Sequence, residues 1–208
     1  MKIWRLFYLM LVVMMATQTS AQFGIGLTVS DDLYNIYSNE RDGIAHRRNG
    51  SVLINPAVGP KIWVGAEKFS VSVEAQANLG LLGLAVKDYK GLGSVSFPIM
   101  TKLNFGGLSG LNKDMAFGWS IGGGIQYNRT EIYGLSQEFR DLGVVRDYFK
   151  TYNVQFGAGM GISGFTGHAF VRYGVNPDLD GANNFHFGIQ MDFNIIKMRK
   201  IKRPESEL

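Results

Sequence analysis

FHFGIQMDFNI, residues 185–195, gives the clearest indication of the fold. Every odd position from Phe185 to Ile195 carries an apolar side chain, and every even position carries a small or polar one. Because successive side chains of a β-strand point to opposite faces, this period of two predicts an extended strand with one apolar face and one polar face. The strand lies close to the C-terminal end of the 208-residue chain.

Seven further stretches alternate in the same way. The clearest is 70–82, in which Val71 and Val73 alternate with Ser72 and Glu74. The others are 23–29, 54–66, 93–105, 115–128, 152–162 and 168–175. Strands of this length, each with one apolar face, predict a barrel wall whose outer surface meets lipid and whose inner surface is polar.

The connections between these stretches differ in length. The expected outer connections 30–53, 129–151, 176–184 and 85–92 have 24, 23, nine and eight residues, and the expected inner ones, 67–68, 106–114 and 163–167, have two, nine and five. Transmembrane barrels have short periplasmic turns and longer outer loops. We therefore predict an all-β fold, an eight-stranded antiparallel up-and-down transmembrane β-barrel over residues 22–196, with both termini in the periplasm.

The N-terminal residues have the pattern of a secretory signal peptide. Lys2 and Arg5 precede an apolar run at 6–15, and Ser20-Ala21 precedes Gln22. A run of about ten residues is too short for the roughly twenty that a spanning helix needs. We predict that residues 1–21 are removed. The chain has no cysteine, which excludes disulfides, thiolate metal sites and a lipid-modified N-terminal cysteine.

The excess of basic residues gathers in one place. Lysine and arginine number 21 against 17 acidic residues. Residues 197–208 form a basic tail, predicted to be periplasmic, in which the basic residues are not interleaved with aromatic ones, so nucleic acid is not an expected partner. The tail is either solvated or in contact with anionic lipid headgroups.

A lumen ionic network is predicted from charged residues on the polar face. These residues share that face with many glycines, whereas a soluble barrel of the lipocalin kind has an apolar interior. Buried charges must be paired, which favours a structural network over a catalytic group. The predicted members are Lys61, Glu74, Lys102, Arg172 and Asp192. His168 and His186 fall on the same face.

No cofactor, metal or catalytic residue is predicted. Residues 176–181 match the first half of an EF-hand calcium loop, but Phe187 stands where that loop needs an acidic ligand. An ordinary turn rich in Asn, Asp and Gly explains the segment.

The mature chain resembles the small outer-membrane β-barrel proteins of Bacteroidota, with the OmpX and OmpA barrels as architectural relatives. The residues that carry the resemblance are Ser20-Ala21-Gln22, the stretch 97–103, which is similar to a Pro-x-x-x-Lys strand of PorT-like barrels, and the C-terminal run 186–193, which resembles an outer-membrane insertion signal. The resemblance implies delivery by the barrel-insertion machinery and residence in outer-membrane lipid. PorT-like proteins take part in type IX secretion.

The function predicted from these features is that of a non-enzymatic scaffold or accessory subunit in a larger outer-membrane complex, for example in protein secretion or assembly. The alternatives are a small-barrel enzyme that modifies lipid A and a narrow solute pore. Tyrosine and arginine favour interfaces, so the first long loop is the candidate partner contact, through Tyr34, Tyr37, Arg47 and Arg48. A rim that is merely solvated is the alternative for this loop.

Overall fold

The computed structural model describes residues 22–38, 48–81, 92–111, 114–133, 147–179 and 181–198. The predicted signal peptide 1–21 and residues 199–208 of the predicted tail lie outside these ranges. The elements are β1 (Gln22–Ser38), β2 (Arg48–Val52), β3 (Pro56–Ala66), β4 (Phe69–Ala75), β5 (Ala77–Gly80), β6 (Leu92–Gly106), the 3-10 helix η2 (Gly107–Ser109), β7 (Ala116–Tyr133), β8 (Phe149–Ile162), β9 (Phe165–Val175) and β10 (Asn183–Met198).

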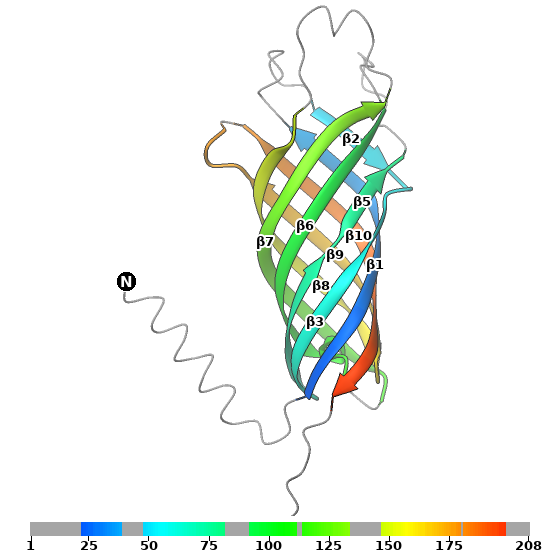
Figure 1. Cartoon of the computed structure of the whole chain (residues 1–208). Helices are drawn as coiled ribbons and strands as arrows, with labels where there is room; N and C mark the ends of the chain where they lie inside the picture. The colour runs from blue at the N-terminus through cyan, green and yellow to red at the C-terminus, as the bar shows by residue number, and fades with distance from the viewer. Residues whose placement is uncertain are drawn as a thin grey trace, which may run out of the picture.

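The strands form one closed antiparallel ring, which Figure 1 shows from the side. Neighbours along the chain pair with each other, apart from β2 with β3 and β4 with β5, and β1 pairs with both β10 and β3, which closes the sheet. The short strands β2 and β5 extend the ring at one end, where β2 pairs with β1 and β5 pairs with β3 and β6. Counting β4 and β5 as one wall position, and β2 and β3 as another, the described residues make the predicted eight-stranded up-and-down barrel.

The two faces of the wall differ as the alternation predicts. On β10, Phe187, Ile189 and Met191 point outward and are 40–43% exposed, whereas Gln190 and Asp192 point inward and are 1–2% exposed. Aromatic rings pair near both ends of the wall, for example Phe105 with Trp119 and Tyr34 with Phe185. The barrel is therefore apolar outside and polar inside, the reverse of a soluble barrel.

The first strand is longer than predicted. The expected loop 30–53 is wrong in part, because β1 continues to Ser38 and β2 begins at Arg48. The pairing of β1 with β10 shifts register between Asp31 and Tyr34. A bulge of this kind adds a residue and breaks the period of two, which hides the strand in the sequence. As a consequence Asp32, Asn35 and Tyr37 belong to the barrel wall.

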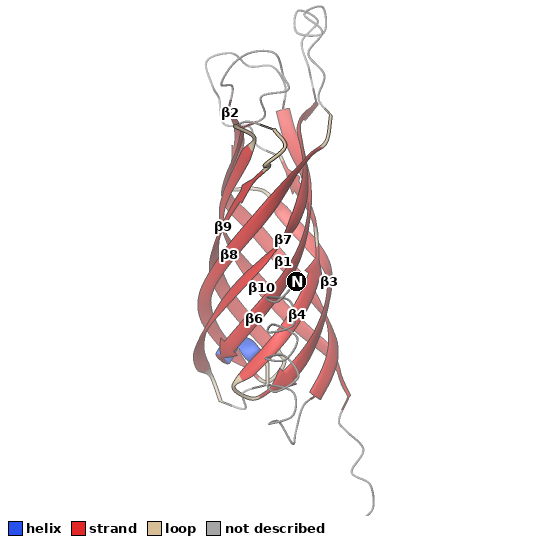
Figure 2. Ribbon diagram, turned by 90° about the vertical axis from the view of Figure 1, so that its left-hand side faces the viewer, coloured by secondary structure: helices blue, strands red, loops and turns tan. Residues whose placement is uncertain are grey.

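The end of the barrel at which Gln22 and Met198 lie is called the lower end here (Figure 1). There, η2 folds inward between β6 and β7, as Figure 2 shows, and Leu108 is 2% exposed. The Ser109 hydroxyl donates to the Glu67 carbonyl over 2.6 Å, and the Gly164 amide donates to the Gly110 carbonyl over 3.1 Å. These bonds hold η2 against the two neighbouring turns. Within the described residues no helix is long and apolar enough to cross a membrane.

Candidate functional site: the charged lumen

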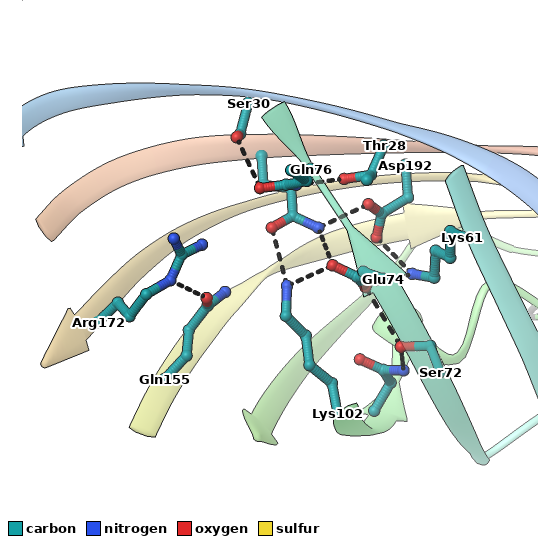
Figure 3. Close-up of polar contacts among 12 residues, drawn as sticks. Thr28, Ser30, Lys61, Ser72, Glu74, Gln76, Lys102, Gln155, Arg172 and Asp192 are labelled. Carbon is teal, nitrogen blue, oxygen red and sulfur yellow. Dashed lines mark hydrogen bonds and ion pairs between the residues drawn. The ribbon is translucent and has the colours of Figure 1, made fainter. Parts of the chain in front are cut away.

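Four of the five predicted network residues lie together in the lower half of the lumen. Lys61 comes from β3, Glu74 from β4, Lys102 from β6 and Asp192 from β10. The Lys61 Nζ atom is 2.6 Å from Asp192 Oδ2 and 3.3 Å from Glu74 Oε1, and Lys102 Nζ is 2.7 Å from Glu74 Oε2. We call this group, which Figure 3 shows, the lower ionic cluster. It holds two positive and two negative charges, so it is neutral as a whole.

Neutral side chains complete the lower ionic cluster. The Gln190 carbonyl accepts from Lys102 over 2.8 Å, and its amide donates to both Glu74 and Asp192. The Ser72 hydroxyl donates to Glu74, and the Thr166 hydroxyl donates to Asp192. Every carboxylate oxygen therefore has at least one partner, which a buried ion pair needs to offset its desolvation.

A glycine on the neighbouring strand makes room for this cluster. A Cβ on Gly122 of β7 would lie 2.7 Å from Cγ of Lys102 and 2.5 Å from the Thr101 carbonyl oxygen. Only a residue without a side chain fits there. The sequence shows many glycines on the lumen face. At this position a glycine is needed because the long charged side chain of Lys102 takes the space of a Cβ.

Arg172 lies apart from the lower ionic cluster, although the sequence predicted it to belong to the same network as Lys61, Glu74, Lys102 and Asp192. Its Nε donates to Gln155 Oε1 over 2.8 Å and its Nη1 donates to Gln126 Oε1 over 3.0 Å. Figure 3 shows Arg172 and Gln155 on one side of the view, away from Lys61 and Asp192. Phe170 lies one lumen position below Arg172 on β9, with its ring 5.1 Å from the guanidinium carbon.

A second polar group, the upper relay, links Arg172 to a carboxylate that the sequence reasoning missed. His186 Nδ1 donates to Asp32 Oδ2 over 2.5 Å, and the amides of Gln126 and Asn184 donate to His186 Nε2 over 3.0 and 3.1 Å. This pattern assigns a neutral imidazole with its hydrogen on Nδ1. The upper relay therefore runs from Asp32 through His186 and Gln126 to Arg172.

The charges on the lumen face could have pointed to Asp32. Together with Asp32, the described lumen carries three acidic residues, Glu74 and Asp192 being the others, against Lys61, Lys102 and Arg172. A balance of buried charges would have required a third carboxylate on the lumen face. Asp32 keeps the lumen-facing phase of Thr28 and Ser30, but the charged Asp31 before it ends the outward apolar run, so Asp32 read as a loop residue.

The predicted partner-contact residues fall in different places. Tyr37 is a correction: it is 2% exposed and its ring packs edge-on against His186 and Phe149, so it is not a surface contact. Tyr34 is half-buried in β1 beside Phe185. Arg48 begins β2, and Arg47 lies outside the described residues. The reason for the error with Tyr37 is again the continuation of β1 beyond residue 29.

The upper end of the lumen contains a small apolar cluster. Tyr37, Phe149 and Ala182 are each 2% exposed, and Leu179 packs against them. Together with η2 at the lower end, this cluster places apolar groups at both ends of the polar interior. His168 and His186 both face the lumen, and neither ring nitrogen of His168 has a hydrogen-bond partner among the described residues.

The chemistry available in this interior is that of buried, mutually bonded polar groups. Among the described residues, no group of three His, Cys, Asp or Glu side chains is placed to hold a metal ion. Asp32 and His186 are 1% and 0% exposed, so a reacting substrate would have to displace the surrounding side chains to reach them. The arrangement suits a structural and electrostatic role.

No family model and no curated protein matches the sequence. Among solved structures, Ail, the attachment invasion locus protein of Yersinia pestis, is 11% identical, with 84% of this chain and 97% of Ail covered and a TM-score of 0.42. The outer membrane protein OprG from Pseudomonas aeruginosa is 15% identical, with 84% and 96% covered and a TM-score of 0.42. Because these identities and TM-scores are low, the barrel architecture is inferred from the strand pairing alone. The Bacteroidota and PorT-like features stay predictions.

Proposed function

We propose that this protein is an integral outer-membrane β-barrel with a closed lumen, and that it acts as a scaffold or accessory subunit of a larger outer-membrane complex. The observation that carries the proposal is the inverted wall, with apolar side chains outside and bonded charges inside. Such a wall is stable only where lipid covers the outer face, since a large exposed apolar band in water drives association.

The orientation follows from the proposed insertion. The lower end has the short turn Glu67-Lys68 and the turn Ser163-Gly164, and both ends of the described chain lie there (Figure 1). In outer-membrane barrels the short turns face the periplasm. The lower end is then periplasmic, and the segments 39–47, 82–91 and 134–146 join strands at the outer end.

Membrane insertion is tested on one outward position in the middle of β8. Val154 is 62% exposed and faces outward. A lysine there costs about 2–4 kcal/mol if that surface lies at the bilayer midplane, so Val154→Lys should lower the urea midpoint of the lipid-reconstituted barrel. The matched control is Lys68→Glu, which changes the charge in a lower turn and should leave the midpoint unchanged. Equal midpoints for V154K and wild type, or release of the wild-type protein by carbonate washing, contradict insertion.

The closed lumen is tested by conductance. An eight-stranded barrel has an interior that side chains just fill, and here the lower ionic cluster and the upper relay occupy it. In planar bilayers the wild-type barrel should show no steady open conductance. A reproducible large conductance would support the narrow solute pore and exclude a closed lumen.

The scaffold role requires a partner at the outer end. Replacing Arg47 and Arg48 with glutamate should weaken co-purification of the partner in mild detergent and leave heat-modifiable gel migration intact. Lys68→Glu at the opposite end is the matched control and should retain the partner. If both variants retain every co-purifying protein, this loop is not the contact. Lipid A from a deletion strain should have an unchanged mass spectrum; an altered one would favour the enzyme.

A further inference from the structure

On one side of the upper lumen, six side-chain oxygens lack hydrogen-bond partners of normal geometry among the described residues, and the Tyr37 hydroxyl, also unpartnered by this criterion, lies beside two of them. The six belong to residues of β1, β2, β5 and β6 and of the turn before β3, and each of these residues is at most 4% exposed. They are Asp32 Oδ1, Ser51 Oγ, Asn55 Oδ1, Asn78 Oδ1, Ser94 Oγ and Ser96 Oγ. We call this group the oxygen cluster. An unpartnered buried polar atom costs free energy, so six of one kind in one region call for an explanation.

Hydrogen bonds fix the direction of three of these oxygens. The Asn78 amide donates to Asp32 Oδ2 over 2.9 Å, and the Asn55 amide donates to the Asp32 backbone carbonyl. Because both amide nitrogens are committed to Asp32, turning either amide round would break its hydrogen bond. Asp32 Oδ2 is itself held by His186, which leaves Asp32 Oδ1 as the uncommitted carboxylate oxygen.

The cluster converges above Gly80 of β5. A Cβ on Gly80 would lie 2.3 Å from Ser94 Oγ, 2.7 Å from Asn55 Oδ1 and 3.3 Å from Cβ of Ser51. Ser94 pairs with Gly80 across the β5–β6 ladder, and Ser96 pairs with Asn78 in the same ladder. The missing side chain of Gly80 therefore lets the Ser94 hydroxyl and the Asn55 carbonyl oxygen approach one another beside Ser51.

The donor set identifies the class of ligand. All six atoms are oxygens: one carboxylate, two amide carbonyls and three hydroxyls. Hard cations prefer oxygen ligands of these kinds, and calcium sites generally use several carboxylates. A single carboxylate, already shared with His186, favours a monovalent over a divalent cation. The cation already in the upper relay, Arg172, is separated from Asp32 by His186 and Gln126.

We propose that the oxygen cluster binds a monovalent hard cation, sodium, inside the upper lumen. The carboxylate of Asp32 supplies the charge, and the carbonyl oxygens of Asn55 and Asn78 with the hydroxyls of Ser51, Ser94 and Ser96 supply neutral ligands. The site goes beyond the scaffold role and does not depend on the identity of any partner. It links the β1 bulge to β5 and β6 through an ion.

The test measures stability against sodium concentration at constant ionic strength. The full barrel, folded in zwitterionic lipid vesicles, is unfolded with urea while sodium chloride replaces choline chloride. A cation that binds only the folded state raises the folding constant by the factor 1 + [Na⁺]/Kd, so above Kd each tenfold rise in sodium raises it about tenfold. Potassium and calcium chloride are run in parallel.

The variant is the double substitution Ser94→Ala and Ser96→Ala. Among the described residues neither hydroxyl makes a hydrogen bond of normal geometry, but the Tyr37 hydroxyl lies beside both. In choline the difference in stability between the double variant and wild type therefore measures the contact with Tyr37, and in sodium the double variant should lose the concentration dependence. The control is Ser120→Ala on β7, another buried serine whose hydroxyl is unpartnered, and it should keep the full sodium effect.

Three outcomes overturn the proposal. Equal wild-type stability in sodium and choline would mean that the oxygens are satisfied by water alone. A sodium effect that survives in the double variant would place the ion elsewhere, and a loss of the effect in S120A as well would make it a general salt effect. A response to calcium that exceeds the response to sodium would contradict the monovalent assignment.

Discussion

The two polar groups of the lumen solve the problem of buried charge in different ways. In the lower ionic cluster, opposite charges touch directly, and each oxygen of Glu74 and Asp192 has a partner. In the upper relay, Asp32 and Arg172 are held apart by neutral His186 and Gln126, and one oxygen of Asp32 has no partner. All the charges of the lower ionic cluster are paired, whereas the upper relay keeps one carboxylate oxygen that can bind a ligand.

We infer that the barrel is more rigid at the lower ionic cluster and better able to bind a ligand near the upper relay. A fully bonded ion cluster is costly to break, because removing one member leaves its partner charged and buried. A relay of neutral groups is less costly to alter, since each link is one hydrogen bond. The four predictions that follow separate these two behaviours.

The largest effect is expected for Glu74→Gln in the lower ionic cluster. The change leaves Lys61 with Asp192 but removes the only carboxylate bonded to Lys102, so an uncompensated buried charge remains. We expect a loss of about 3–5 kcal/mol in the free energy of unfolding, measured by urea titration of the reconstituted barrel. The double variant with Lys102→Met removes one charge of each sign and should recover part of the loss; no recovery would argue against direct pairing.

The next effect is expected for His186→Phe in the upper relay. The variant takes one donor from Asp32 and the shared acceptor from Gln126 and Asn184, while Asn78 still donates to Asp32. We expect a loss of about 2 kcal/mol, since buried hydrogen-bonding groups lose partners but no charge is stranded. Urea midpoints and slopes give the value. A loss equal to that of E74Q would make the two groups alike.

A smaller effect is expected for Gln155→Leu. This change removes one of the two acceptors of Arg172, and Gln126 remains bonded to the guanidinium. We expect a loss of about 1.5 kcal/mol, the lower end of the net contribution of one hydrogen bond to a charged group. Thermal gel-shift midpoints compared with wild type provide the measurement. If stability falls as far as in H186F, Gln155 supports more than this single bond.

The smallest effect is expected for Ser120→Ala. The hydroxyl is buried and has no partner among the described residues, so its removal breaks no bond of either polar group. Stability should change by less than about 0.5 kcal/mol or rise slightly. The same urea titration measures it, and a clear loss would reveal an interaction of Ser120 that neither group accounts for.

The alternation of β10 and of 70–82 was sufficient to predict the barrel and the facing of its residues. Period two is a local property of an extended chain, so it survives without knowledge of the tertiary structure. The prediction failed for β1 beyond Val29, where the bulge between Asp31 and Tyr34 breaks the period. The charged Asp31 ended the outward apolar run just before Asp32, and the bulge that follows moved Tyr37 to the lumen face.

Alternation along the strands was enough to predict five charged side chains of the lumen, Lys61, Glu74, Lys102, Arg172 and Asp192. It did not determine which of them meet, because depth in a barrel depends on strand tilt and stagger, which only the closed ring defines. The tertiary structure therefore decided that four of these charges form one cluster and that Arg172 belongs with Asp32. It also decided that the oxygens of Asn55 and Ser94, which are 39 positions apart, meet beside Gly80, because the pairing of β3 with β5 and of β5 with β6 brings them together.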